Sequence, residues 1–127
     1  MSFLSKRILA FLPGSVLVVF STLTIEREDK ESLVLDADGW RFEFNKVSKL
    51  IFRSGRLVTS FGSIQSVDVE HYVNGKRFEW CVLKLTLQDG RKIFVGRSIN
   101  SAELSIVAAH IADAVSRSVR TIEKVGF

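Results

Sequence analysis

The stretch NSAELSIVAAHIADAVSRSVRTIEK, from Asn100 to Lys124, decides the fold that the sequence predicts. Its apolar residues recur at steps of three and four positions, which is typical of a helix with one apolar stripe. The stripe consists of Leu104, Val107, Ala108, Ile111, Val115, Val119 and Ile122. Asn100 is suited to cap the first turn, and Glu103 to complete a capping box. We therefore predict one amphipathic helix from Asn100 to Lys124 that covers an apolar sheet.

Upstream of this helix, short runs with alternating apolar residues are separated by turn dipeptides. Asp38-Gly39 lies between Leu33–Ala37 and Trp40–Phe44, and Asp-Gly is a strong hairpin signal because it tolerates positive φ. Further turns are predicted at Ser54-Gly55, Asn74-Gly75 and Asp89-Gly90. The flanking strands are two short ones within Lys49–Phe61, then Ser63–Val73, Phe78–Leu87 as the longest, and Arg91–Arg97. We expect six or seven antiparallel strands in a meander, closed by the helix.

The alternation predicts which side chains face the core. The expected core residues of the strands are Trp40, Phe42, Phe44, Ile64, Val67, Val69, Cys81, Leu83, Leu85 and Leu87. Cys81 is therefore interpreted as a buried, unreactive thiol. Asp68 and Glu70 fall on the opposite phase, which we interpret as the solvent side, so general acid–base work by them is disfavoured.

Composition describes one globular domain of 127 residues, 46% hydrophobic and 25% charged. The formal net charge of +4 permits an anionic partner without requiring one. A single cysteine excludes an internal disulfide and a multi-thiolate metal site, and it fits a reducing compartment. The sequence has no Walker loop, no G-x-S-x-G and no H-E-x-x-H motif. We predict no catalytic residue, metal or cofactor.

The first residues carry a separate signal. Lys6 and Arg7 precede an uncharged run, Ile8–Ile25, which Pro13-Gly14 interrupts. A membrane-spanning helix needs about 20 predominantly apolar residues, so this run is too short and too polar for a good span. The alternatives are a segment inserted in a membrane or its interface, and a cleaved signal.

The preferred interpretation of residues 1–31 is an apolar turn of helix within Phe3–Leu12 followed by a strand, Val16–Ile25. Glu26–Glu31 is then a charged loop. This segment packs on, or leads into, a domain formed by residues 32–127.

Four stretches carry a resemblance to a known family. They are LVLDADGWRF (33–42), FGSIQSVDVEHYV (61–73), EWCVLKLTLQDGRKIFVG (79–96) and SAELSIVAAHIADAV (101–115), and together they resemble the bacterial pleckstrin-homology-like (PH-like) family. The resemblance implies an α+β, mainly β fold: a partly open antiparallel β-barrel of six or seven strands, capped by one C-terminal helix. It also implies a binding module for proteins, peptides or membrane lipids, often beside membrane segments. Many relatives carry two clear membrane helices at the N-terminus, whereas this chain has one short, interrupted run.

The first candidate site is the outward face of the strand Phe78–Leu87. We expect Phe78, Trp80 and Val82 to point away from the core, joined by Tyr72 or Phe94 from neighbouring strands. An exposed aromatic cluster is typical of a protein-binding hot spot. The alternative is that the segment Phe3–Leu12 folds back and covers this face.

The second candidate site is the stretch Asn45–Ser60, which contains basic residues and no acid. Its basic residues are Lys46, Lys49, Arg53 and Arg56. Projecting together from a twisted hairpin, they would bind a phosphate or an anionic lipid headgroup; the alternative is a solvated polar face. Nucleic acid is disfavoured, because few aromatic residues are interleaved with the charges.

We therefore predict a non-enzymatic protein-interaction module, a subunit or adaptor of a bacterial complex, in the cytoplasm or at the inner face of the cytoplasmic membrane. The alternative is a peripheral membrane protein whose basic hairpin binds anionic headgroups while its apolar N-terminus inserts; Lys6 and Arg7 would join the hairpin, and Phe3, Leu4 and Phe11 would insert. A small enzyme would require His71, His110 and Cys81 to converge in a pocket. The sequence also allows a homo-oligomer.

Overall fold

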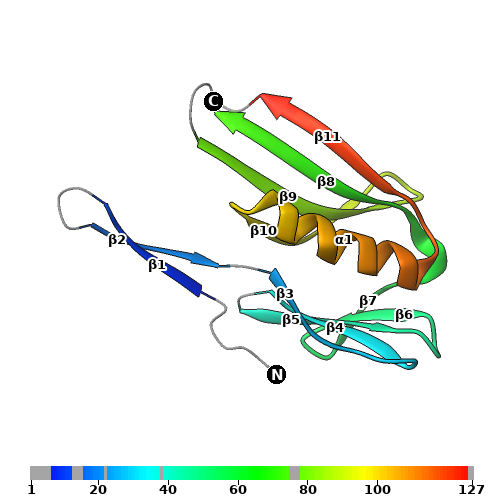
Figure 1. The fold of residues 1–127 in the computed structure, drawn as a ribbon. Helices are drawn as coiled ribbons and strands as arrows, with labels where there is room; N and C mark the ends of the chain where they lie inside the picture. The colour runs from blue at the N-terminus through cyan, green and yellow to red at the C-terminus, as the bar shows by residue number, and fades with distance from the viewer. Residues whose placement is uncertain (1–6, 13–15, 22, 38, 75–77, 126–127) are drawn as a thin grey trace.

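The structure is a computed structural model that describes residues 7–12, 16–21, 23–37, 39–74 and 78–125, with side chains for 23–37, 39–73 and 80–124. The described chain forms eleven β-strands, one α-helix and one 3-10 turn (Figure 1). The predicted α+β, mainly β class is confirmed at this level. The strands form a five-stranded sheet, a four-stranded sheet and a two-stranded hairpin, and over the described residues the sheets do not close into a barrel.

The five-stranded sheet is an antiparallel meander in chain order. Its strands are β3 (Leu23–Glu28), β4 (Ser32–Ala37), β5 (Trp40–Asn45), β6 (Leu50–Arg53) and β7 (Arg56–Ser60). The predicted hairpins around Gly39 and Gly55 are confirmed, and both glycines adopt positive φ, 99° and 82°. The expected loop Glu26–Glu31 is shorter than predicted, because β3 continues to Glu28 through a bulge and pairs with β4.

The four-stranded sheet has the order β10-β9-β8-β11. Its strands are β8 (Ile64–Asn74), β9 (Phe78–Leu87), β10 (Lys92–Ser98) and β11 (Val119–Val125). β8, with 11 residues, is longer than β9, with 10, contrary to the prediction. β11 pairs with β8 in parallel, so the expected purely antiparallel arrangement is wrong. The predicted turn at Asn74-Gly75 lies partly outside the described residues.

The helix α1 runs from Ser101 to Val115 and is shorter than predicted. It ends because Ser116 adopts the left-handed conformation at φ 59°, where its N–H bonds back to the last helical turn. The residues beyond are rich in β-branched side chains, which suit a strand, and they form β11. The predicted cap is confirmed, since Asn100 Oδ1 accepts the Glu103 N–H at 3.1 Å. The Asn100 N–H bonds to Ser98 Oγ at 2.9 Å instead of closing a capping box.

The core lies between the two larger sheets, with α1 inside it. The helix contacts β8, β9, β10 and β11 of one sheet and β3 and β5 of the other (Figure 1). Its buried residues are Leu104, Val107, Ala108, Ile111, Ala112 and Val115. The predicted strand core is confirmed, with Trp40 half-buried at its margin. Because α1 covers one face of the four-stranded sheet, the opposite face points away from the core.

The N-terminal segment agrees with the prediction only in part, since the expected strand Val16–Ile25 is confirmed over its described residues, 16–21 and 23–25, but the expected helical turn is not. β1 (Arg7–Leu12) and β2 (Val16–Ser21) form an antiparallel hairpin, so the expected helical turn is wrong for this part of Phe3–Leu12. The valine-rich sequence of β2 favours a strand, and pairing with β2 gives β1 its backbone partners. The described part of the chain contains no helix with the length and apolar character needed to cross a membrane.

Candidate functional site

The candidate site is the face of the four-stranded sheet that points away from α1, here called the outer face. The strand register aligns its residues in rows: Asp68 is opposite Lys84 and Arg120, and Tyr72 is opposite Trp80 and Lys124. Side chains of one phase share a face of a sheet. The outer face consists of Ser66, Asp68, Glu70, Tyr72, Trp80, Val82, Lys84, Thr86, Lys92, Phe94, Arg97, Arg120, Ile122 and Lys124.

Asp68 is the anchor of this face. Its side chain is completely buried, and three side chains donate hydrogen bonds to it. Oδ1 accepts hydrogen bonds from Ser66 Oγ at 2.8 Å and from Arg120 Nε at 3.0 Å. Oδ2 accepts from Arg120 NH2 at 2.8 Å and from the Thr86 hydroxyl. Burial alone would raise the pKa of Asp68, but the bonds from Arg120, Thr86 and Ser66 outweigh it and lower that pKa to about 2.

Glu70 is a second, completely buried carboxylate, one pleat further along β8. Its Oε1 accepts from the Tyr72 hydroxyl at 2.8 Å and lies 3.1 Å from Lys84 Nζ. Its Oε2 lies 3.5 Å from Lys92 Nζ and 3.9 Å from Lys124 Nζ, with no hydrogen bond. Burial opposes ionisation, yet the hydroxyl and the ammonium groups lower the pKa of Glu70 below its ordinary value.

The prediction that Asp68 and Glu70 are exposed to solvent is therefore wrong, because both side chains are completely buried. Both do point away from the core, but long side chains from β9, β10 and β11 lie over them. The alternation of the sequence finds the face correctly. It does not reveal the side chains that cover the two carboxylates, because the predicted helix contains Arg120 and Lys124, which in the structure lie on β11 beside β8.

The cations above the carboxylates are only partly buried. The side chains of Lys84, Lys92, Lys124 and Arg120 are 26%, 39%, 42% and 51% exposed, respectively. Four positive groups thus share two carboxylates. An ammonium has three donors and a guanidinium five, so these groups keep N–H donors for an incoming anion. The outer face is therefore a cationic surface whose charged groups are held in place by the buried carboxylates of Asp68 and Glu70.

An aromatic pair flanks the charged cluster. The rings of Tyr72 and Trp80 stack with centroids 5.2 Å apart and planes 3° apart, and both side chains are half-buried. Val82, opposite Glu70, is 8% exposed. The structure thus places three of the four predicted partner-binding residues next to one another on the outer face. The fourth, Phe78, has a backbone in β9 but a side chain outside the described residues.

The predicted basic site is divided between two ends of a hairpin. Lys49 precedes β6 and Arg53 ends it, so the length of the strand, about 13 Å at ~3.3 Å per residue, separates them. Lys46 Nζ lies 3.2 Å from Glu28 Oε2. The Arg53 guanidinium stacks over Trp40, 4.7 Å from the ring centroid, and Arg56 is its register partner. The four residues do not form one patch.

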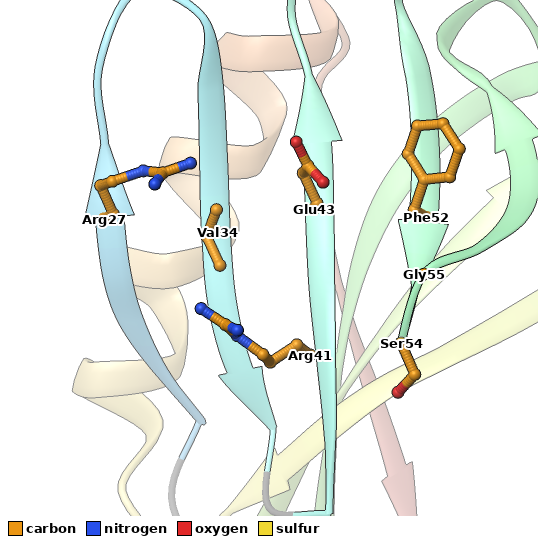
Figure 2. Close-up of a pocket in the computed structure, with 7 residues that line it drawn as sticks. All are labelled: Arg27, Val34, Arg41, Glu43, Phe52, Ser54 and Gly55. Atoms are coloured by element: carbon orange, nitrogen blue, oxygen red, sulfur yellow. The ribbon is translucent and has the colours of Figure 1, made fainter.

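A shallow hollow lies on the five-stranded sheet, on the side away from the helix (Figure 2). Its lining residues are Arg27, Val34, Arg41, Glu43, Phe52, Ser54 and Gly55. Its two arginines already have anionic partners: Arg41 pairs with Glu26, and Arg27 lies 3.6 Å from Asp29. Two arginines thus face Glu26, Asp29 and the lining residue Glu43 in the hollow, whereas four cations share two carboxylates on the outer face. The hollow is therefore less suited to a new anion than the outer face.

The three residues proposed for an enzyme have different neighbours. His71 and Cys81 are register partners on β8 and β9. His110, on α1, has its Nδ1 2.7 Å from Glu28 Oε1 of β3. Across the described residues no three metal-ligating side chains gather in one place.

Comparison with known protein families, with curated proteins and with solved structures finds no match to this chain. The candidate site is therefore defined by its geometry alone.

Proposed function

We propose that this chain is a non-enzymatic protein-interaction module of PH-like architecture, and that its outer face binds the partner. The observation that carries the proposal is the arrangement of four half-exposed cations over the buried Asp68 and Glu70, beside the stacked Tyr72 and Trp80. In this proposal the module serves as a subunit or adaptor of a bacterial complex near the cytoplasmic membrane.

The energetics of the cluster support a role in binding. Buried ion pairs cost desolvation, and apolar residues of similar size often stabilise a fold equally well. A cation that is already fixed, however, loses less conformational freedom when it meets an anion than a freely rotating lysine does. Arg120, held by two bonds to Asp68, is such a pre-organised group. The cluster therefore supplies pre-organised charges for recognition in addition to its contribution to stability.

The stacked aromatic pair supports a protein partner. Tyrosine and tryptophan are enriched at binding hot spots, and a pair that is already stacked loses little freedom when it is covered. Tyr72 is further held by its bond to Glu70. A protein partner can cover this rigid aromatic pair together with the charges beside it.

The test is affinity purification from the native host, followed by mass spectrometry, with the wild type and Trp80→Asp. Loss of the main co-purifying protein in Trp80→Asp is expected. Leu57→Asp is the matched control, because Leu57 is 60% exposed on β7 of the other sheet. Far-UV circular dichroism must show that both variants are folded. Equal recovery of that protein by the wild type and a folded Trp80→Asp would contradict the proposal.

The lipid alternative is tested with the same proteins. Vesicles of phosphatidylcholine with phosphatidylserine should not co-sediment the wild type if the outer face is a protein site. Salt-sensitive co-sedimentation that a charge-reversing Lys49→Glu variant abolishes would favour the basic hairpin and the lipid function instead.

A further inference from the structure

We propose that the partner is an extended acidic segment that adds as a further strand to the outer edge of β11. This inference rests on the proposed function of the outer face and names the chemistry of its partner. It depends on three properties of β11: its place at the edge of the sheet, its regular backbone and the charge pattern of its outer side chains.

β11 is the edge strand with the most regular pairing in the two large sheets. No other described strand pairs with its outer edge. The edge strands β3 and β10 each have a bulge in their pairing, and so does the pairing of β6 with β7. The seven pairs of β11 with β8 run without a register shift. Bulges are one way in which proteins block an edge against further strands, and β11 lacks this protection.

The backbone of β11 presents alternate hydrogen-bonding groups to this edge. In a parallel ladder, one residue in two directs both its N–H and its C=O to the same neighbour. The Val67 N–H donates to the Ser118 carbonyl at 3.0 Å, so the even-numbered residues from Ser118 onward face β8. Val119, Thr121 and Glu123 therefore direct their backbone groups to the open edge, where an extended segment can pair with them.

The side chains of β11 select the partner. Arg120, Ile122 and Lys124 occupy successive outer-face positions. In a neighbouring strand, the residues opposite them lie within reach, and opposite charges attract. The best-fitting segment therefore has an acidic residue, an apolar residue and a second acidic residue at alternate positions. This pattern reads the same in both directions, so it holds for parallel and antiparallel addition.

The same side chains disfavour a second copy of the chain at this edge. Two antiparallel β11 strands centred on Ile122 would place Arg120 opposite Lys124 of the other copy. Like charges directly opposite each other are destabilising. In this register the cationic strand therefore pairs better with an acidic segment than with itself.

The probe is a fluorescein-labelled synthetic peptide in which glutamate, valine and glutamate alternate with threonine. Fluorescence anisotropy should show saturable binding to the wild type that weakens as salt rises. A peptide of the same composition with its two glutamates adjacent should bind at least tenfold more weakly. Equal affinity for both peptides, or no binding of the alternating peptide, would overturn the inference.

The decisive variant is Thr121→Pro. Its ring removes an edge-facing N–H and crowds the edge, but it leaves the bonds from β11 to β8 in place. We expect at least a tenfold loss of peptide affinity, whereas Thr121→Val retains it. Nuclear magnetic resonance should also show that the peptide slows amide exchange at Val119, Thr121 and Glu123. Unchanged peptide affinity in a folded Thr121→Pro would overturn strand addition.

The two proposals can fail separately. If Trp80→Asp loses the native partner while the peptide binds wild type and Thr121→Pro equally, the outer face binds protein without an added strand, and only the further inference is wrong. The second outcome is that Thr121→Pro and the wild type co-sediment equally with phosphatidylserine vesicles and neither binds the peptide. In that case the outer face recognises a membrane, and an acidic protein segment is excluded as the partner.

Discussion

Lowering the pH is expected to destabilise this protein through Asp68. The folded pKa of Asp68 is about 2, against an ordinary value of 3.8. At ~1.4 kcal/mol per pKa unit, this difference corresponds to about 2 kcal/mol of stability at neutral pH. Because the folded pKa lies below the unfolded one, the contribution is fully present above about pH 4 and is lost as the pH falls to about 2.

The assay is urea unfolding, followed by the fluorescence of Trp40 and Trp80, at pH values between about 5 and about 2. Over this range the wild type should lose about 2 kcal/mol more unfolding free energy than Asp68→Asn, which has no carboxylate to protonate. Asp113→Asn, at an exposed position of α1, is the matched control and should follow the wild type.

The comparison of pH slopes is needed because Asp68→Asn also leaves Arg120 without its anion. This loss lowers stability at every pH, by about 2 kcal/mol or more when a buried pair is broken. It cancels when each protein is compared with itself at two pH values. An equal loss of unfolding free energy by the wild type and Asp68→Asn between the two ends of this pH range would show that Asp68 is not held as an ionised anchor.

Three further changes have defined outcomes. Asn100→Ala should lower the free energy of unfolding by about 1 kcal/mol, because the Glu103 N–H loses its acceptor, and Asn100→Asp should restore it. Phe42→Ala should lower it by about 3–5 kcal/mol, because Phe42 is completely buried; a loss below about 1 kcal/mol would contradict its place in the core. The Cys81 thiol, which is 1% exposed, should react with an aromatic disulfide reagent only as fast as the protein unfolds.

The local features of the fold could be predicted because single residues determine them. Gly39 and Gly55 supply positive φ, and each sets a hairpin between strands whose alternation is unambiguous. Phe42 and Phe44 lie on one phase and are completely buried, as expected. Periodicity gives the faces of these strands correctly because neighbours in the chain are also neighbours in the sheet.

The first strand, β1, could not be predicted on the same basis. The residues of β1 are apolar throughout except Arg7, so their pattern does not separate a helix from a strand. Pairing with β2 decides the conformation. The basic hairpin shows a related limit, because a count of charges in Asn45–Ser60 does not reveal that Arg53 stacks on Trp40.

The length of the helix and the burial of the acids were missed for one reason. The apolar residues Val119 and Ile122 fit a helical period, and this obscured the preference of β-branched residues for a strand. Once Ser116 ends the helix, the chain returns alongside β8, and Arg120 comes to lie directly opposite Asp68. Asp68, which would be exposed to solvent on an isolated hairpin, is thus the residue that anchors β11 through Arg120.

The ion pair between Asp68 and Arg120 relates the fold to the proposed binding. Arg120 holds β11 on the sheet through Asp68, and its side chain remains 51% exposed on the outer face. A partner that adds to β11 would therefore meet a strand whose side chains are already fixed, so that less freedom is lost on binding. If Asp68 were replaced by Asn, Arg120 would remain positive but lose its anchor. The acidic peptide should then bind more weakly to Asp68→Asn, although the net charge of the face has become more positive. Stronger binding would mean that charge alone, and not its fixed placement, determines affinity.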